Sequence, residues 1–149
     1  NGGQREVARR PFLEHAEAGL DPAEFAPAFV ASIVFQPLPG APEGLARLRD
    51  AGLSLACVSN WDISLHGHLE RAGLAGYFAE IVSSAEVGVA KPEAAVFVIA
   101  LDRLGVAPER ALHIGGGDGD RDGAAAAGLA FEPPPVATLP ERLGLGRRP

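Results

Sequence analysis

The chain has 149 residues, of which 47% are hydrophobic and 21% are charged, as in a single globular domain, and this composition excludes disorder over the whole length. Its formal net charge of -6 excludes a broad basic face for nucleic acid or anionic lipid, so an anionic substrate must be bound at a local site. The longest nearly unbroken apolar run, residues 25–35, is too short to span a bilayer, and we expect a cytoplasmic protein.

Three further expectations follow from the counts of individual residue types. The single cysteine, Cys57, cannot form an intramolecular disulfide and is expected in the core. The sequence starts with Asn1 and contains no Met, so we expect that a segment of the native protein precedes it. Twelve of the thirteen basic residues are Arg, and Lys91 is the only lysine, which favours a specific role for that residue.

The first 35 residues have the pattern of two helices. Residues 6–18 form one helical pattern, and residues 22–33 form a second that begins with an Asp-Pro pair and has one apolar face. The Pro-rich and Gly-containing residues 36–40 then break the pattern and mark a boundary. We therefore expect an N-terminal helical piece over 1–35, a main body over 36–132, and a Pro-rich tail over 133–149 that forms a loose arm.

Helical and strand patterns alternate along the main body. We predict helices over 41–51, 62–72, 92–104 and 120–127, and strands over 53–59, 80–83, 111–115 and 129–131. Strands that are separated by helices of this length form a parallel α/β sheet with helices on both faces. The loops that follow the strands then gather at one edge of the sheet.

Polar and charged side chains lie in three of these loops. Ser59 and Asn60 combine a hydroxyl and an amide with backbone N–H groups at a helix start, which suits a phosphate, although for this pair alone a polar turn that ends the strand is the more common explanation. Lys91 suits a phosphoryl oxygen, its alternative being a solvated lysine. The carboxylates of the Gly-rich loop suit a cation such as Mg²⁺, or a solvated acidic turn in which Asp120 caps a helix; they are Asp118, Asp120 and Asp122.

These segments together resemble the haloacid dehalogenase superfamily of hydrolases, in particular its phosphatases with a helical cap inserted near the N-terminus. The segments that match the family are PLPGA at 37–41, VSNWD at 58–62, GVAKP at 88–92, HIG at 113–115 and DRDGAAAAG at 120–128. The resemblance covers residues 36–132 and implies a parallel Rossmann-like sheet, with residues 1–35 as the remnant of the cap.

The resemblance also implies a reaction and a set of roles. In the family an aspartate attacks a phosphate ester, and water hydrolyses the aspartyl-phosphate with Mg²⁺ as cofactor. Ser59 and Asn60 would then bind the phosphoryl group, Lys91 would stabilise its charge as a catalytic residue, and Asp120 would help to bind the metal.

The chain departs from the family pattern in two places. The family nucleophile lies in a D-x-D-x-T type motif after a strand that precedes the cap, whereas the only aspartate here before Asp50 is Asp21, inside a helical pattern. Gly116 stands where the first acid of the metal-binding loop is usual, which leaves Asp118 as a substitute ligand. We therefore expect the central nucleophile strand to be missing, and a gap in the sheet between residues 54–58 and 111–115.

The leading hypothesis is thus a Mg²⁺-dependent phosphatase of small phosphorylated metabolites, represented by a chain that is inactive alone. Carbon-halogen hydrolysis is a weaker alternative, because it needs no magnesium and leaves the acidic loop without a role. A third hypothesis is a catalytically inactive binding or regulatory domain in which Gly116 is a real loss. An apolar surface left open by the missing segment would bind a partner or a second copy. We interpret His113 as a structural residue and expect no metal pair at His66 and His68.

Overall fold

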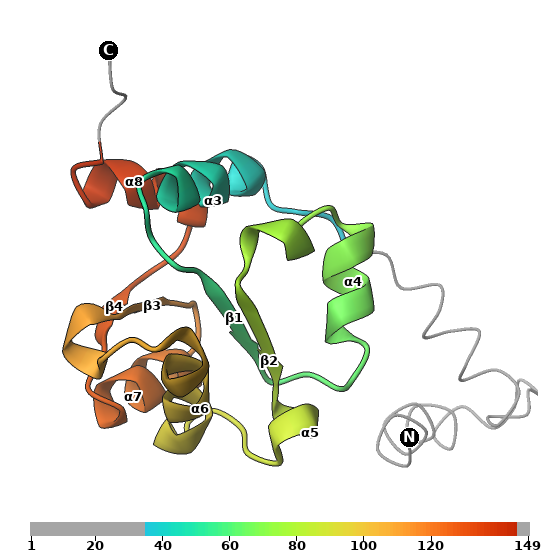
Figure 1. The fold of residues 1–149 in the computed structure, drawn as a ribbon, viewed down its shortest axis with the longest axis vertical. Coiled ribbons are helices and arrows are strands. Elements are labelled where there is room, and N and C mark those ends of the chain that lie inside the picture. Colours follow the sequence, from blue (N-terminus) through green and yellow to red (C-terminus); the bar gives the residue numbers. More distant parts are fainter. Residues whose placement is uncertain (1–34, 146–149) are drawn as a thin grey trace, which may run out of the picture. The chain divides into compact units, whose positions relative to one another are not determined.

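Helices and short parallel strands alternate through the computed structural model, which describes residues 35–145 (Figure 1). Residues from Pro37 onward belong to one unit. The helices predicted over 6–18 and 22–33, and the cap remnant that they would form, lie outside the described residues. No described helix has both the length and the apolar character needed to cross a membrane.

The strands form two separate parallel pairs. Strand β1 (Ala56–Ser59) pairs with β2 (Glu80–Ser83). Strand β3 (Leu112–Ile114) pairs with β4 (Ala130–Glu132). Within the described residues no ladder joins β1 to β3, because each sheet has two strands. The predicted α/β class and the predicted gap between residues 54–58 and 111–115 are both confirmed.

The helices follow the predicted order, and several boundaries differ by a few residues. They are α3 (Ala41–Asp50), α4 (Leu65–Arg71), α5 (Ser84–Val87), α6 (Ala94–Leu104), α7 (Asp118–Ala126) and α8 (Leu139–Arg142). Single 3-10 turns occupy residues 75–77, 108–110 and 136–138.

The starts of three helices correct the prediction. The Asp62 side chain accepts the N–H of Ser64 at 2.7 Å, which makes a local turn before α4 starts rather than the cap of a helix that starts at 62. Pro92 lies in a turn ahead of α6 and does not start it. Helix α7 starts at Asp118, two residues before the predicted start, because Asp120 closes its first turn with Gly117.

Helix α6 connects the strands through the core. Its Val96, Phe97 and Ala100 are buried together with Val82 of β2, and Val58 of β1 packs partly buried against them. The helix contacts β1, β2 and α7, and α7 in turn contacts β3 and β4. The two strand pairs are therefore linked by this helical layer in place of a continuous sheet.

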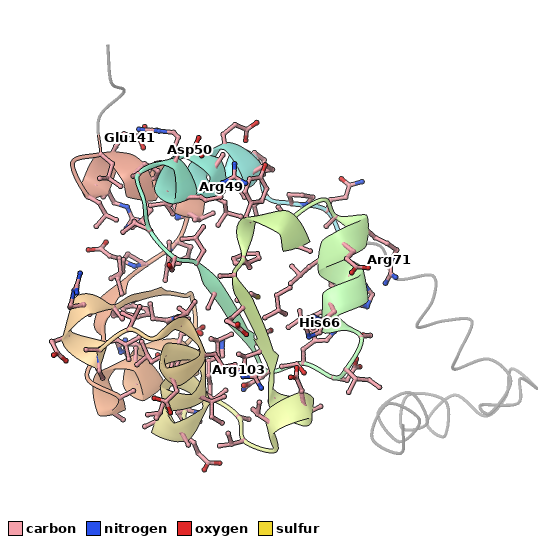
Figure 2. The ribbon with its side chains drawn as sticks, viewed as in Figure 1. Arg49, Asp50, His66, Arg71, Arg103 and Glu141 are labelled. Atoms are coloured by element: carbon pink, nitrogen blue, oxygen red, sulfur yellow. The ribbon has the colours of Figure 1, made fainter. Side chains whose placement is uncertain are left out.

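The predicted loose arm after residue 133 is wrong for the part that the structure describes. Helix α8 lies beside α3 (Figure 1), and its Leu139 and Pro140 are buried. Arg47 of α3 forms an ion pair with Glu141, which is labelled on α8 in Figure 2, and its guanidinium also donates to the carbonyl of Leu145 at 2.9 Å. The C-terminal segment thus packs on α3 through apolar burial and charge-assisted bonds.

The contact between α3 and residues 136–138 leaves no room at Gly44. A Cβ atom there would lie 2.5 Å from the carbonyl oxygen of Val136 and 3.0 Å from the Cα atom of Ala137, and both are backbone atoms that cannot rotate away. We predict that Gly44→Ala lowers the free energy of unfolding by about 1–3 kcal/mol in urea denaturation, through overpacking. Gly76→Ala is the matched control, because a Cβ atom at Gly76 meets nothing within 4 Å. Equal effects of the two substitutions would contradict the packing described here.

Candidate active site

Three segments that are distant in sequence meet at Lys91, in the loop between α5 and α6. The Lys91 ammonium group donates to Asp120 Oδ1 at 2.6 Å and to the carbonyl of Val58 at 3.2 Å. Val58 belongs to β1, and Asp120 lies in the first turn of α7. The predicted convergence of the three loops is confirmed by these contacts. The side chains of Lys91 and Asp120 are only 14% and 17% exposed, so the pair is largely withdrawn from water.

Asn60, which directly follows β1, binds the backbone of Lys91. Its Nδ2 donates to the Lys91 carbonyl at 3.0 Å, and its Oδ1 accepts the Lys91 N–H at 2.8 Å. Both ends of the carboxamide are thus used to hold the loop that carries the ammonium group. Since an amide nitrogen has two hydrogens, one N–H of Asn60 has no acceptor among the described residues and is left for a ligand. The sequence placed Asn60 beside a phosphate but gave no sign of this contact.

Ser59 ends β1 and is partly buried. Among the described residues its hydroxyl has no hydrogen-bond partner, and it is not a buried unsatisfied group. Its partner in the β1–β2 register is Ser83, which is fully buried and accepts the N–H of Glu86 at the start of α5. The two serines therefore differ in use, and the hydroxyl of Ser59 is the one that can serve a ligand.

Asp120 accepts hydrogen bonds on both carboxylate oxygens. In addition to Lys91, the ring Nε2 of His113 lies 2.8 Å from Oδ1, and the backbone N–H of Gly117 donates to Oδ2 at 3.1 Å. Burial acts to raise the pKa of Asp120, but the hydrogen bonds from Lys91, His113 and Gly117, together with the charge of Lys91, lower it to about 2. Asp120 is therefore a carboxylate that only accepts.

His113, on β3, is the site residue that sequence reasoning missed. Burial lowers the pKa of His113 more than the hydrogen bond to Asp120 raises it, so the imidazole is neutral at neutral pH. Because Asp120 only accepts, the proton of the neutral ring lies on Nε2. The ring also packs edge-on against Phe97 at 4.8 Å between centroids. The sequence signal was its place on the strand that leads into the loop of Asp120, but a spacing does not say where a ring points.

The acidic loop does not offer the donor set that the family's magnesium site requires. Gly116 has no side chain, and Asp118 is 88% exposed and paired with Arg121 at 3.0 Å. Asp122 pairs with the same arginine. Residues 35–145 contain no group of three or more His, Cys, Asp or Glu side chains that could hold a metal ion. The described residues therefore do not fit a magnesium ion.

Other polar residues near the site have local partners. The N–H of Trp61 donates to the hydroxyl of Ser84, and its indole N–H donates to that of Ser64 at 3.3 Å, so this ring packs the loop after β1 onto the neighbouring turns. His66 and Arg103, both labelled in Figure 2, pair with Glu86.

Cys57 lies on β1, in the strand that leads to Ser59 and Asn60. Burial raises the pKa of its thiol, and the charge of Lys91 offsets part of that effect. The thiol is therefore the protonated, poorly nucleophilic form at neutral pH.

The low pKa of Asp120 predicts a specific acid sensitivity. A carboxyl group whose pKa is lower in the folded chain stabilises the fold above its unfolded pKa, and this contribution is lost as the pH falls toward the folded pKa. Between pH 4 and pH 2 we expect Asp120→Asn to remove about 2 kcal/mol of the decline in unfolding free energy seen in the unaltered chain. Asp122→Asn, at an exposed neighbour, is the control for pH-dependent urea denaturation. Identical pH profiles for the two variants would contradict the description of Asp120.

The close approach of Gly115 to Asp120 gives a second prediction. A Cβ atom at Gly115 would lie 2.6 Å from the Cβ atom of Asp120, so Gly115→Ala must displace the carboxylate from Lys91. We expect a loss of about 1–3 kcal/mol in unfolding free energy. Gly116→Ala, whose added Cβ atom meets only Pro134 Cγ at 3.6 Å, is the adjacent control and is expected to change stability little.

Comparison with known proteins identifies the family of the chain. A phosphoserine phosphatase from Thermus thermophilus is 40% identical over 117 residues, which are 76% of this chain and 47% of that protein. A phosphoglycolate phosphatase from Thiobacillus denitrificans is 31% identical, with 99% of this chain and 66% of that protein covered. The chain thus spans about half to two thirds of the length of these relatives.

The solved structures agree. A phosphatase of the same superfamily from Thermococcus onnurineus superposes with a TM-score of 0.68 at 27% identity, covering 74% of this chain and 60% of that one. The sequence model of the haloacid dehalogenase-like hydrolases matches residues 4–128. With that match over most of its length, and with parallel strands that bring Asn60, Lys91 and Asp120 together, the chain belongs to the haloacid dehalogenase-like hydrolase family.

Proposed function

We propose that the chain carries the phosphoryl-binding half of a phosphatase that acts on small phosphorylated metabolites. The observation that carries the proposal is the fixed position of the Lys91 ammonium group, which donates to the Val58 carbonyl of β1 and to Asp120, while Asn60 binds the Lys91 backbone. An ammonium group held in this way, with a hydroxyl and an amide N–H beside it, presents three kinds of donor to one anion. The names of the phosphatase relatives support a phosphate monoester as that anion.

In this proposal the attacking carboxylate comes from a strand that fills the gap between β1 and β3. Among residues 35–145 each of these strands is paired on one side only, so a parallel strand placed between them would pair with both. Its carboxyl end would then lie at the same edge of the sheet as Ser59. We propose that this strand belongs to a segment other than the described residues, and that the 149 residues alone do not hydrolyse phosphate esters.

The chain's own residues have defined tasks in this reaction. Lys91 binds a phosphoryl oxygen and stabilises the charge that develops during transfer, while Ser59 and Asn60 orient the same group. Asp120 and Asn60 keep the ammonium group in place. We propose no metal-dependent role for the described residues, because they do not supply the ligands of the family's magnesium site.

Carbon-halogen hydrolysis is the second candidate, and one observation favours it. The sequence argument against it was that the acidic loop would have no role without magnesium, but Asp120 holds Lys91 directly. The carboxylate that a 2-haloacid carries before and after the halide leaves would also be bound by an ammonium group. A catalytically inactive binding domain is the third candidate.

We also propose a cytoplasmic location, a cap remnant over residues 1–35, and self-association through an exposed apolar surface.

The test uses a protein in which the chain is extended by an N-terminal segment that carries a strand ending in D-x-D-x-T. We expect this protein to release phosphate from p-nitrophenyl phosphate, and Lys91→Ala to lower kcat/KM by about 10²–10³-fold, because an oriented charged donor is removed. Arg103→Ala removes a cation that is paired with Glu86 outside the site, and it is the matched control.

Three outcomes of this assay separate the candidates. Phosphate release that depends on Lys91 supports the proposal. Halide release from a 2-haloacid in place of phosphate release supports the second candidate. Turnover that is equal in the Lys91→Ala and Arg103→Ala proteins, or hydrolysis by the unextended 149 residues, contradicts the proposal.

A further inference from the structure

We propose that Asp120 is the anchor of Lys91 and not a metal ligand, so that the Lys91 ammonium group is the positive charge of this pocket. The inference deepens the proposed function and rests on it only for the identity of the anion. It departs from the role that family resemblance gave to Asp120.

The carboxylate of Asp120 is already engaged. Oδ1 lies 2.6 Å from the Lys91 nitrogen and 2.8 Å from His113 Nε2, and Oδ2 accepts the Gly117 N–H at 3.1 Å. A carboxylate has about four lone-pair sites, of which three are therefore occupied. A magnesium ion on Oδ1 would have to displace the ammonium group or the imidazole, and magnesium itself gives up its water ligands reluctantly.

The surroundings of Asp120 oppose a cation further. The nearest charge to its carboxylate is the ammonium group of Lys91, which repels a divalent cation at the same oxygen. No second carboxylate offsets this repulsion within the acidic loop, because Gly116 has none and Asp118 is exposed beside Arg121. A metal site here would combine one shared ligand with an adjacent positive charge.

His113 acts as a positioning residue for the anchor. Its neutral ring donates to the same oxygen as Lys91, and Phe97 packs against the ring edge-on. The bond from Gly117 fixes the other oxygen, and Gly115 leaves space where any Cβ atom would collide with the carboxylate. The orientation of Asp120 is thus fixed by three donors, and an oriented carboxylate holds the ammonium group in one place.

The ammonium group keeps one donor for a ligand. Of its three N–H bonds, one is directed to Asp120 and one to the Val58 carbonyl. Within the described residues the third has no acceptor, and Ser59 and Asn60 each retain an unused donor beside it. A small oxyanion, phosphate or carboxylate, satisfies these donors without a metal ion.

The single lysine makes a direct test possible. Lys91 is the only lysine of the chain, so acetylation by sulfosuccinimidyl acetate, followed by peptide mass mapping to separate the α-amine of Asn1, reports on this one side chain. We expect slow acetylation of Lys91 in the full 149-residue chain. Asp120→Asn keeps an acceptor for the Gly117 N–H and the size of the side chain, and is expected to raise the rate about tenfold or more through loss of a charge-assisted bond. Asp122→Asn, on the same helix, is the control and is expected to leave the rate unchanged.

Magnesium provides the second arm, which uses the unaltered chain and one variant. If Asp120 were a metal ligand, millimolar Mg²⁺ would compete with Lys91 for Oδ1 and accelerate acetylation. We expect no acceleration in the unaltered chain. Gly116→Asp restores the carboxylate that the family motif has at this position, and the glycine has room for the added Cβ atom. A magnesium response that appears only in Gly116→Asp supports the proposal, and a response of equal size in the unaltered chain contradicts it.

Two results would contradict the proposal that Asp120 anchors Lys91. One is faster acetylation of Lys91 in the unaltered chain when Mg²⁺ is added, with no such effect in Asp120→Asn. The other is an unchanged rate in Asp120→Asn, with circular dichroism showing that the variant is folded. Neither result involves turnover, so loss of the proposed phosphatase activity with a normal acetylation pattern would refute the reaction and leave the anchor intact.

Discussion

The ion pair between Lys91 and Asp120 is the interaction on which the site depends. It joins two segments that are 29 residues apart, and a third segment joins it through Asn60 and Val58. A pair of opposite charges that is mostly withdrawn from water must be well hydrogen-bonded. The reason is that removing each charge from water costs on the order of several kcal/mol. The bonds from His113 and Gly117 meet that requirement for the carboxylate. The loops are therefore held by polar contacts that have a defined geometry.

The contacts around Lys91 and Asp120 are built on a fold that has no continuous sheet among the described residues. Strands β1 and β3 carry the two sides of the site, yet they are not hydrogen-bonded to one another within the described residues. The apolar face of α6 is what they share, since Phe97 packs in the core beside Val82 and also against the ring of His113. Packing of one helix thus positions both the core and the imidazole that orients Asp120. A substitution that changes the side-chain volume at Phe97 would therefore shift the ring of His113 and, through it, the carboxylate of Asp120.

Sequence patterns predicted the topology better than the contacts. The strand over 80–83 has its predicted bounds, and parallel topology alone brought the loops of Asn60, Lys91 and Asp120 to one edge. The role of His113 was not predictable, because a side-chain rotamer decides which atom its nitrogen meets. The packing of α8 on α3 was also missed. Leu139 and Pro140 are buried there, but they lie in a tail of prolines and polar residues that has no recognisable apolar pattern. Local pattern reports on elements, whereas these contacts depend on tertiary packing.

The exchange of a carboxylate for Gly116 changes the charge balance of the site. With two acids in the loop, a divalent cation would offset charges that one ammonium group cannot. Among the described residues, the ammonium group of Lys91 already balances the buried carboxylate of Asp120, and a divalent cation bound to these two residues would leave them with excess positive charge. An oxyanion can bind here without breaking this ion pair only if Lys91 accepts it without releasing Asp120. The third N–H of the ammonium group allows this, because binding the anion and holding the anchor then use different hydrogens of the same nitrogen.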